Sequence, residues 1–229
     1  ARVRRDGVTA VLVQLTSDDG LVGWGECCPG PNIESIDAIV RAAAPILLGR
    51  DPWNNEKLAQ HFFHTAHWDL REMSGNFAYA GIDMALRDLQ GKACGQPLYR
   101  LMGGRVRKEI DYFCYLAAGD PDSVATQAAT ARAQGYRVYY LKVGVNFPSE
   151  LEQVAALREA IGPEGKIRID ANGAWSVAEA VRHLDAFDRY TIDFAEQPVS
   201  QDPVRNMAEL RQKTRVPLAA NEGLWRRGD

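Results

Sequence analysis

The chain has 229 residues and a mass of 25.3 kDa, with 46% hydrophobic and 25% charged residues. This composition excludes a disordered, collagen-like or coiled-coil chain, and the length predicts one or two domains. The net charge of −3 and the pI of 5.9 leave no basic footprint, so we expect no nucleic-acid and no membrane partner. The sequence also lacks an apolar run near the ~18 residues that span a bilayer.

The cysteines form no CxxC pair, which argues against a zinc site; they are Cys27, Cys28, Cys94 and Cys114. No apolar signal segment opens the sequence. We therefore expect reduced thiols and a cytoplasmic protein. We interpret Cys27 and Cys28 as packed thiols rather than nucleophiles, because no histidine is near them in the sequence.

The first hundred residues predict strands followed by helices. Residues 8–26 hold two β-rich runs around the turn signal SDDG, which is typical of a hairpin. Residues 33–48 and 76–90 have helical periodicity and end at glycines. This order is typical of an α+β domain. The Gly103–Gly104 turn is the predicted boundary, which assigns residues 1–104 to this domain.

Short apolar runs alternate with amphipathic helices in the second half of the chain. The predicted strands are 110–115, 138–143, 166–170, 191–196 and 216–220. Three helix starts carry capping signals: Ser149 with Glu152, Ser176 with Glu179, and Asp202 before Pro203. A strand–helix repeat of this length indicates βαβ units and a parallel sheet.

Charged residues fall at the ends of four of these strands. They are Lys142, Asp170, Glu196 and Glu222, spaced 28, 26 and 26 residues apart. One βα unit takes about that length, since ~250 residues make eight units in a barrel. The spacing therefore predicts that each residue lies at the C-terminal end of its strand, which is the edge that carries the site in barrels and in open parallel sheets.

The three acids would repel one another at that edge unless a cation lies between them. All-oxygen ligation suits Mg²⁺ or Mn²⁺. Lys142 would lie close to the dication, which favours its neutral amine and makes it a candidate general base. A metal beside a lysine base fits removal of the proton next to a carboxylate, with the charge of the resulting enediolate stabilised.

Alternation along the strands supports this placement. Tyr140 shares a face with Lys142, as Arg168 does with Asp170. The opposite face carries apolar residues that helices would cover: Leu141, Ile167 and Ile169. We interpret Arg168 as an ion-pair partner of the acids, in preference to a substrate contact.

The segments around these positions resemble the enolase superfamily, in its mandelate racemase / muconate lactonizing enzyme branch. The matching segments are YLKVG at 140–144, RIDANGAW at 168–175, FAEQP at 194–198 and PLAANEG at 217–223. In the first half, GLVGWGE at 20–26 resembles the family's N-terminal strand, and residues 80–104 resemble its domain junction. The segments occur in the family's order over nearly the whole chain.

The resemblance implies an α+β capping domain packed on an α/β (TIM-type) barrel, of which residues 105–229 form an incomplete part. It implies Asp170, Glu196 and Glu222 as Mg²⁺ ligands and Lys142 as the base, the second lysine of a KxK motif. Asn172 would lie near the metal and the substrate carboxylate. The implied partner is a small carboxylate substrate, and we expect a homo-oligomer.

Two positions depart from the family pattern. Tyr140 stands where the family has the first lysine of KxK, so that lysine's help in neutralising the substrate carboxylate is lost or replaced by a hydrogen bond. Family members place the third ligand at the position of either Asn221 or Glu222. A carboxylate is the better ligand, which favours Glu222.

Two segments of the first half invite a functional interpretation. His61, His64 and His67 follow three-residue spacing, which drifts around a helix, so we do not expect them to converge on a metal. The segment 26–33 (ECCPGPNI) is either a plain connector or, by the family parallel, a loop over the barrel mouth that shapes substrate choice.

We therefore predict a Mg²⁺-dependent isomerase, which is a racemase, epimerase or cycloisomerase. The alternatives are a dehydratase of sugar acids and, in another class, a non-catalytic metal-binding scaffold. Five strand–helix positions cannot close a barrel of seven or eight strands, so we expect an open edge after residues 216–222. The first N-terminal strand is expected to be missing, which would leave the hairpin edge unpaired.

Overall fold

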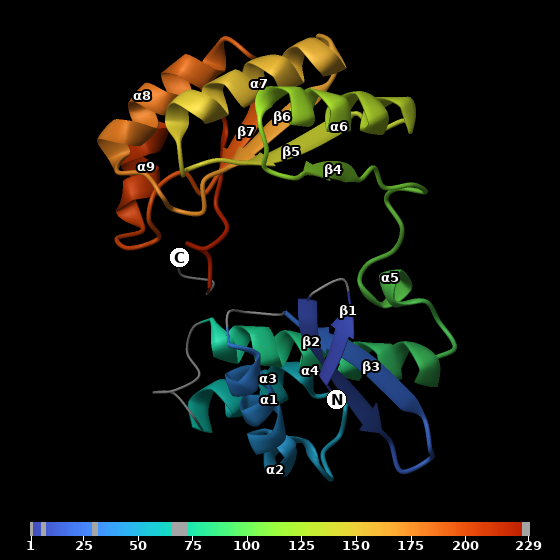
Figure 1. Cartoon of the computed structure of the whole chain (residues 1–229). Helices are drawn as coiled ribbons and strands as arrows, with labels where there is room; N and C mark the ends of the chain where they lie inside the picture. The colour runs from blue at the N-terminus through green and yellow to red at the C-terminus, as the bar shows by residue number, and fades with distance from the viewer. Residues whose placement is uncertain (1, 6–7, 29–31, 66–72, 226–229) are drawn as a thin grey trace. The chain divides into compact units, whose positions relative to one another are not determined.

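The computed structural model describes residues 2–5, 8–28, 32–65 and 73–225. The chain forms two compact units, Ala1–Lys108 and Glu109–Asp229, each with its own hydrophobic core (Figure 1). None of the helices in the described ranges has the length and apolar character that a membrane span needs.

Over its described residues, the first unit combines a three-stranded antiparallel sheet, in the order β1-β2-β3, with five helices. The strands are β1 (Arg2–Arg5), β2 (Val8–Thr16) and β3 (Val22–Cys27). The helices are α1 (Ile33–Ala42), α2 (Ala44–Leu47), α3 (Asn55–Thr65), α4 (Ser74–Ala93) and α5 (Leu98–Leu101). The predicted hairpin is confirmed as β2 and β3.

Strand β1 corrects the expectation of a missing first strand. Its residues pair antiparallel with β2, from Arg2 opposite Val11 to Arg5 opposite Val8, so the hairpin edge that we expected to be open is covered. The segment RVRR carries no apolar alternation, whereas a ladder is made by backbone groups. A pattern of side chains therefore gave no signal for this strand.

The predicted helix over 33–48 is divided at Ala43 into α1 and α2. Pro45 lies in the first turn of α2. A proline inside a continuous helix would remove a backbone hydrogen bond and clash with the preceding turn, so the chain starts a new helix around it. The predicted helix at 76–90 is observed as α4, extended at both ends.

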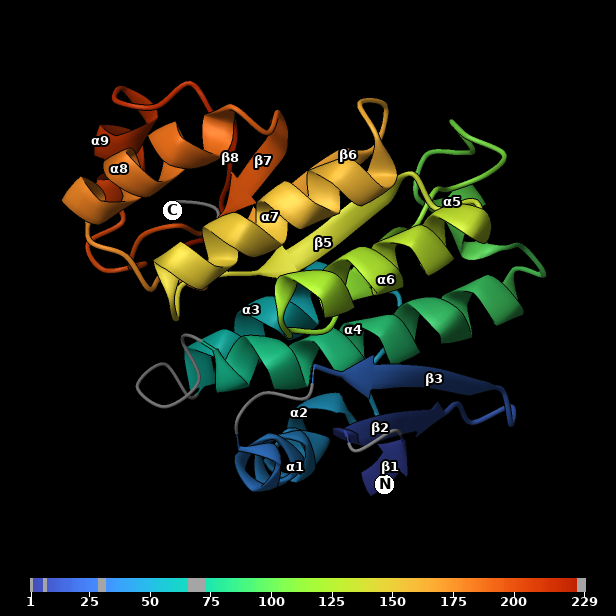
Figure 2. The ribbon, with the colours of Figure 1, turned by 45° about the horizontal axis from the view of Figure 1, so that its top comes forward.

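Helix α4 runs along the sheet and packs directly on β3 (Figure 2). A Cβ atom on Gly25 would lie 1.9 Å from the carbonyl oxygen of Gly81, and one on Gly81 would lie 2.5 Å from Sγ of Cys27. Real Cβ contacts are not this short, so helix and strand can meet here only through glycine. The two segments that resemble the family, 20–26 and 80–104, thus form one contact.

The second unit is a five-stranded parallel sheet in the order β4-β5-β6-β7-β8, with helices over one face (Figure 1). The strands are β4 (Phe113–Leu116), β5 (Val138–Lys142), β6 (Lys166–Asp170), β7 (Ile192–Glu196) and β8 (Leu218–Ala219). The helices are α6 (Pro121–Ala133), α7 (Phe147–Ile161), α8 (Val177–Asp188) and α9 (Arg205–Arg211).

The parallel βα order confirms the predicted α/β (TIM-type) architecture. Leu141, Ile167 and Ile169 are fully buried, as predicted for the face that helices cover. Over the residues that the structure describes, β4 and β8 each pair on one side only, so the sheet is open at both edges and the barrel is incomplete.

Helix starts in this unit agree with the sequence at one position of three. The capping box of Ser176 and Glu179 is confirmed. The predicted box of Ser149 with Glu152 is wrong, because α7 already begins at Phe147 and Ser149 lies inside it. The helix expected after Asp202 begins at Arg205, since the Ser200 hydroxyl ties residues 200–202 into a turn instead.

Candidate active site at the strand ends of the second unit

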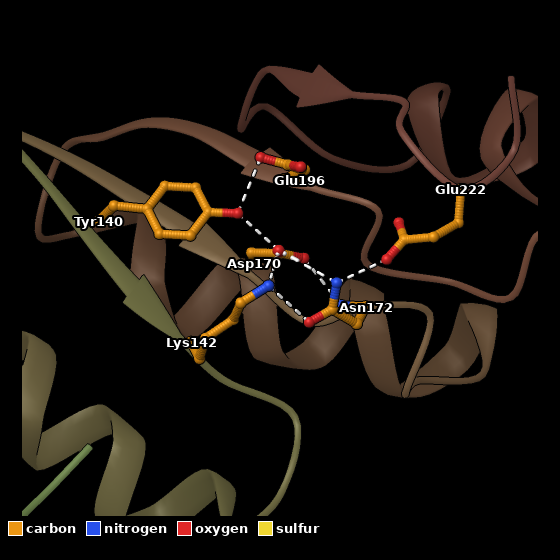
Figure 3. Close-up of polar contacts among 6 residues, drawn as sticks. All are labelled: Tyr140, Lys142, Asp170, Asn172, Glu196 and Glu222. Atoms are coloured by element: carbon orange, nitrogen blue, oxygen red, sulfur yellow. Dashed lines mark hydrogen bonds and ion pairs between the residues drawn. The ribbon is translucent and has the colours of Figure 1, made fainter. Parts of the chain in front are cut away.

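The four charged residues singled out by their spacing lie at the C-terminal ends of the strands of the parallel sheet (Figure 3). Lys142, Asp170 and Glu196 are the last residues of β5, β6 and β7, and Glu222 follows β8. Asp170 is directly opposite Lys142 on one side and Glu196 on the other in the strand register. The sheet thus brings together residues that are 26 to 80 positions apart.

Asp170 is the centre of this group and is almost completely buried, with 1% of its surface exposed. Its Oδ2 atom accepts from the Tyr140 hydroxyl at 2.5 Å and from Asn172 Nδ2 at 3.1 Å, and forms an ion pair with Lys142 Nζ. Its Oδ1 atom accepts from the Asn172 backbone N–H at 2.8 Å. These donors and the lysine charge offset the cost of burying the carboxylate.

Tyr140, where the family has a lysine, lies between two of the acids. Its hydroxyl is 2.5 Å from Asp170 Oδ2 and 3.0 Å from Glu196 Oε2. Burial, followed by the hydrogen bonds to Asp170 and Glu196, holds the pKa of the phenol far above its usual value, so it stays protonated. Its ring stacks on that of Phe113 with centroids 4.8 Å apart. Tyr140 is therefore a neutral donor between two carboxylates.

Asn172 connects the third acid to the other two. Its backbone has a φ of 46°, in the left-handed region that asparagine tolerates better than most residues. Its Oδ1 atom accepts from Lys142 Nζ at 2.7 Å, and its Nδ2 atom donates to Glu222 Oε1 at 2.5 Å. A continuous chain of polar contacts therefore runs from Glu196 to Glu222 (Figure 3).

The three acids are linked through these donors, and as placed they are not grouped closely enough to bind one metal ion together. In the described ranges, no three His, Cys, Asp or Glu side chains stand close enough together to hold a metal ion as they are placed. Oε2 of Glu222 is buried without a hydrogen-bond partner among the described residues, so one acceptor at this edge is unused. An all-oxygen donor set with an unused buried acceptor fits a hard divalent cation in its chemistry.

Arg168 does not pair with these acids, so that interpretation is wrong. Its Nε atom donates to Asp193 at 2.9 Å, and its guanidinium lies over the ring of Phe194. The register between β6 and β7 shifts after Ile167, which brings Asp193 next to the arginine. Arg168 does form an ion pair, but the pair is half-buried and its partner is Asp193.

One residue of this edge gave no sequence signal beyond its place in the FAEQP segment. Gln197 is fully buried, and its side-chain Oε1 accepts from the backbone N–H groups of Asn221 and Gly223. These two residues flank Glu222 on either side. An uncharged glutamine after a strand has no obvious role until the neighbouring segment is placed against it.

The candidate histidines of the first unit that the structure describes belong to no group of three metal-binding side chains. His61 and His64 line a hollow of about 570 Å³ together with Arg50, Asp51 and Lys57. His67 lies outside the described residues, as do residues 29–31 of the loop 26–33.

The thiols are free, and the interpretation of both Cys27 and Cys28 as packed is half right. Cys27 is buried and Cys28 is exposed. Burial raises the pKa of the Cys27 thiol to about 11, which makes it a poor nucleophile.

Two family models match the chain. Residues 1–103 match the mandelate racemase / muconate lactonizing enzyme N-terminal domain, and residues 123–229 match the enolase C-terminal domain-like model. The N-succinyl-L-Arg/Lys racemase of Bacillus cereus is 32% identical over 94% of this chain and 58% of its own length. The D-galactarolactone cycloisomerase of Agrobacterium fabrum is 34% identical over 98% of this chain and 62% of its own.

A solved structure shows the same fold with a metal. The dipeptide epimerase of Cytophaga hutchinsonii, in complex with Mg and the dipeptide D-Ala-L-Val, has a TM-score of 0.86 and 26% identity over 95% of this chain and 59% of that one. Other relatives are named muconate cycloisomerase and D-gluconate dehydratase. The chain spans less than two thirds of the length of these relatives. Both halves of the sequence match models of one family, and the fold agrees with that of a solved relative. The chain therefore belongs to the mandelate racemase / muconate lactonizing enzyme family of the enolase superfamily.

Proposed function

We propose that this chain carries the metal ligands and one acid–base residue of an enzyme that removes the proton next to a carboxylate, in a racemisation, epimerisation or cycloisomerisation. The observation that supports this most is the connected group of Lys142, Asp170, Asn172, Glu196 and Glu222 at the C-terminal edge of the sheet. Relatives named racemase, epimerase and cycloisomerase support the reaction class.

Asp170, Glu196 and Glu222 are proposed to hold Mg²⁺ or Mn²⁺. When bound, such a cation supplies Lewis-acid stabilisation of the negative charge that develops on the substrate carboxylate. Asn172 and Tyr140 contribute neutral donors that keep the carboxylates oriented toward one another. The Mg-bound dipeptide epimerase supports the choice of metal.

Lys142 is proposed to exchange the proton with the substrate carbon. In the observed arrangement its Nζ atom is tied to Asp170 and Asn172 oxygens, and 37% of its side chain is exposed. In the direction that delivers a proton to the substrate carbon, the ammonium of Lys142 is the acid. The neutral amine is the base of the opposite direction.

The base assignment is tested by exchange of the substrate α-hydrogen in D₂O with N-succinyl-L-arginine and L-Ala-L-Glu, in the full protein with Mg²⁺. Lys142→Ala is expected to slow the exchange by about 10²–10⁴-fold, because a positioned acid–base group is lost. Lys166→Ala is the control, because Lys166 begins β6 at the opposite edge of the sheet. Exchange that survives Lys142→Ala at the native rate contradicts the assignment.

The metal assignment is tested by Mn²⁺ titration. Glu196→Gln is expected to weaken Mn²⁺ binding by at least about tenfold, whereas Glu152→Gln, an exposed carboxylate on α7, should leave it unchanged. Unchanged affinity in Glu196→Gln would count against the proposed ligand set. A protein that binds the metal but exchanges the α-hydrogen of no carboxylate would instead be the non-catalytic metal-binding scaffold.

Dehydration of a sugar acid is the second candidate, and the relative named D-gluconate dehydratase favours it. The first proton transfer is the same, and a β-hydroxyl is then lost as water. Incubation with D-gluconate separates the two, because a dehydratase yields a keto acid whereas an epimerase only inverts or exchanges the α-centre.

A further inference from the structure

Gln197 touches the backbone of every segment that carries one of the three acids. It directly follows Glu196 in the chain, its carbonyl accepts from the Gly173 N–H at 2.6 Å, and its own N–H donates to Ala219 at 2.9 Å. Gly173 belongs to the loop that follows Asp170, and Ala219 ends the strand before Glu222. The residue therefore joins three strand ends through its main chain alone.

The side chain of Gln197 holds the segment of Glu222 from both sides. Oε1 accepts from the N–H of Asn221 at 3.0 Å and from that of Gly223 at 3.1 Å. Nε2 donates to the carbonyl of Val199 at 2.9 Å, which fixes the amide in one orientation. An amide oxygen has two lone pairs, and both are used here.

The conformation of Gln197 indicates that this arrangement is specific. Its φ is 34°, in the left-handed region that favours glycine, and the side chain is fully buried. A non-glycine residue in this region is strained and persists only where the surroundings determine it. An acidic side chain would fit here as the neutral acid, because a charged carboxylate at this buried position would add charge next to three acids.

We propose that Gln197 is a positioning residue that sets the backbone of Glu222 relative to Asp170 and Glu196, and thereby the geometry in which the three acids can share a cation. This inference rests on the proposed function of the site. Partners that orient metal ligands are worth about 10–100-fold in metal affinity. Gln197 acts on the main chain on either side of the proposed ligand Glu222, through its hydrogen bonds with the Asn221 and Gly223 N–H groups.

The test compares variants of the full protein by Mn²⁺ titration and by amide hydrogen exchange without metal. Gln197→Met keeps the volume and loses both acceptor bonds, so its Kd for Mn²⁺ should rise at least tenfold and the amides of Asn221 and Gly223 should exchange at least tenfold faster. Gln197→Glu keeps both acceptor bonds, so the two amides should stay protected and the Kd should rise threefold at most. Gln153→Met is the matched control, since that buried amide donates to the Gly119 carbonyl and touches none of the acids.

A merely structural role would lower the melting temperature in both Met variants and change Mn²⁺ affinity in neither. That result, or unchanged exchange at Asn221 and Gly223 in Gln197→Met, overturns the inference while native Mn²⁺ binding leaves the proposed function intact. Absence of Mn²⁺ binding by the native protein would overturn both. If Gln197→Met does not fold, Gln197→Asn provides the same test, because its amide is one methylene too short to reach both N–H groups.

Discussion

The two units differ in how far along the chain their ion pairs reach. In the first unit, the described salt bridges all join residues four apart on one helix, such as Arg87 with Asp83 and Lys92 with Asp88. In the second unit, Lys142 pairs with Asp170 and Arg168 with Asp193, across neighbouring strands. Local pairs accompany any surface helix, whereas a pair between distant segments exists only because the fold brings those segments together.

The first unit joins its sheet and long helix at glycines, where backbone touches backbone. Asp88 and Lys92 of the helix add hydrogen bonds to the main chain of Trp24 and Val22. The second unit meets its helices through large apolar side chains and leaves its strand ends polar. The packing of helix on sheet therefore depends on glycines without side chains in the first unit and on large apolar side chains in the second.

The glycine contact is expected to show the largest effect. Gly25→Ala places a Cβ 1.9 Å from the Gly81 carbonyl oxygen, so backbone must move and the free energy of unfolding should fall by about 3 kcal/mol or more. Trp24→Ala is the control, because its side chain is 49% exposed, and should cost within about 1 kcal/mol. Urea unfolding measures both. Equal costs in the two variants would show that the contact is not what orders this unit.

Tyr140→Phe tests the distant polar contacts of the second unit. It removes the donor shared by Asp170 and Glu196, so the free energy of unfolding should fall by about 2 kcal/mol, as expected for hydrogen bonds to charged groups. Tyr139→Phe is the neighbouring control, since that hydroxyl donates only to the Tyr136 carbonyl three residues away, and should cost about 1 kcal/mol. A Tyr140 variant no less stable than the Tyr139 variant would break the comparison.

Double-mutant cycles on two ion pairs should give the smallest effects. Coupling between Arg87 and Asp83 should be about 0.3–0.5 kcal/mol, as for exposed pairs four apart on a helix. Coupling between Arg168 and Asp193, whose side chains are only 29% and 24% exposed, should approach about 1 kcal/mol. Chemical denaturation of the four single and two double variants measures both cycles. The reverse ranking would mean that distance along the chain is no guide to coupling here.

Much of the second unit could be predicted because its pattern is local and repeated. Each strand is a short apolar run with period two, and equal spacing puts the charged residue at the same end of successive strands. This spacing predicts Lys142, Asp170 and Glu196 at the same strand ends, and the strand register has them there. The helix-covered face followed from the same alternation.

Local sequence pattern accounts for the alternation of strands and helices in the second unit, for the strand ends at which Lys142, Asp170 and Glu196 lie, and for the family. Only the tertiary structure decided which polar groups meet: Arg168 with Asp193, the Tyr140 hydroxyl between two acids, and Gln197 with the backbone around Glu222. It also paired β1, whose side chains carry no strand pattern. The physical reason is that such contacts depend on register, on a shift after Ile167 and on left-handed turns at Asn172 and Gln197. Those features are set by the packing of segments 20 to 60 positions apart, which no local periodicity encodes.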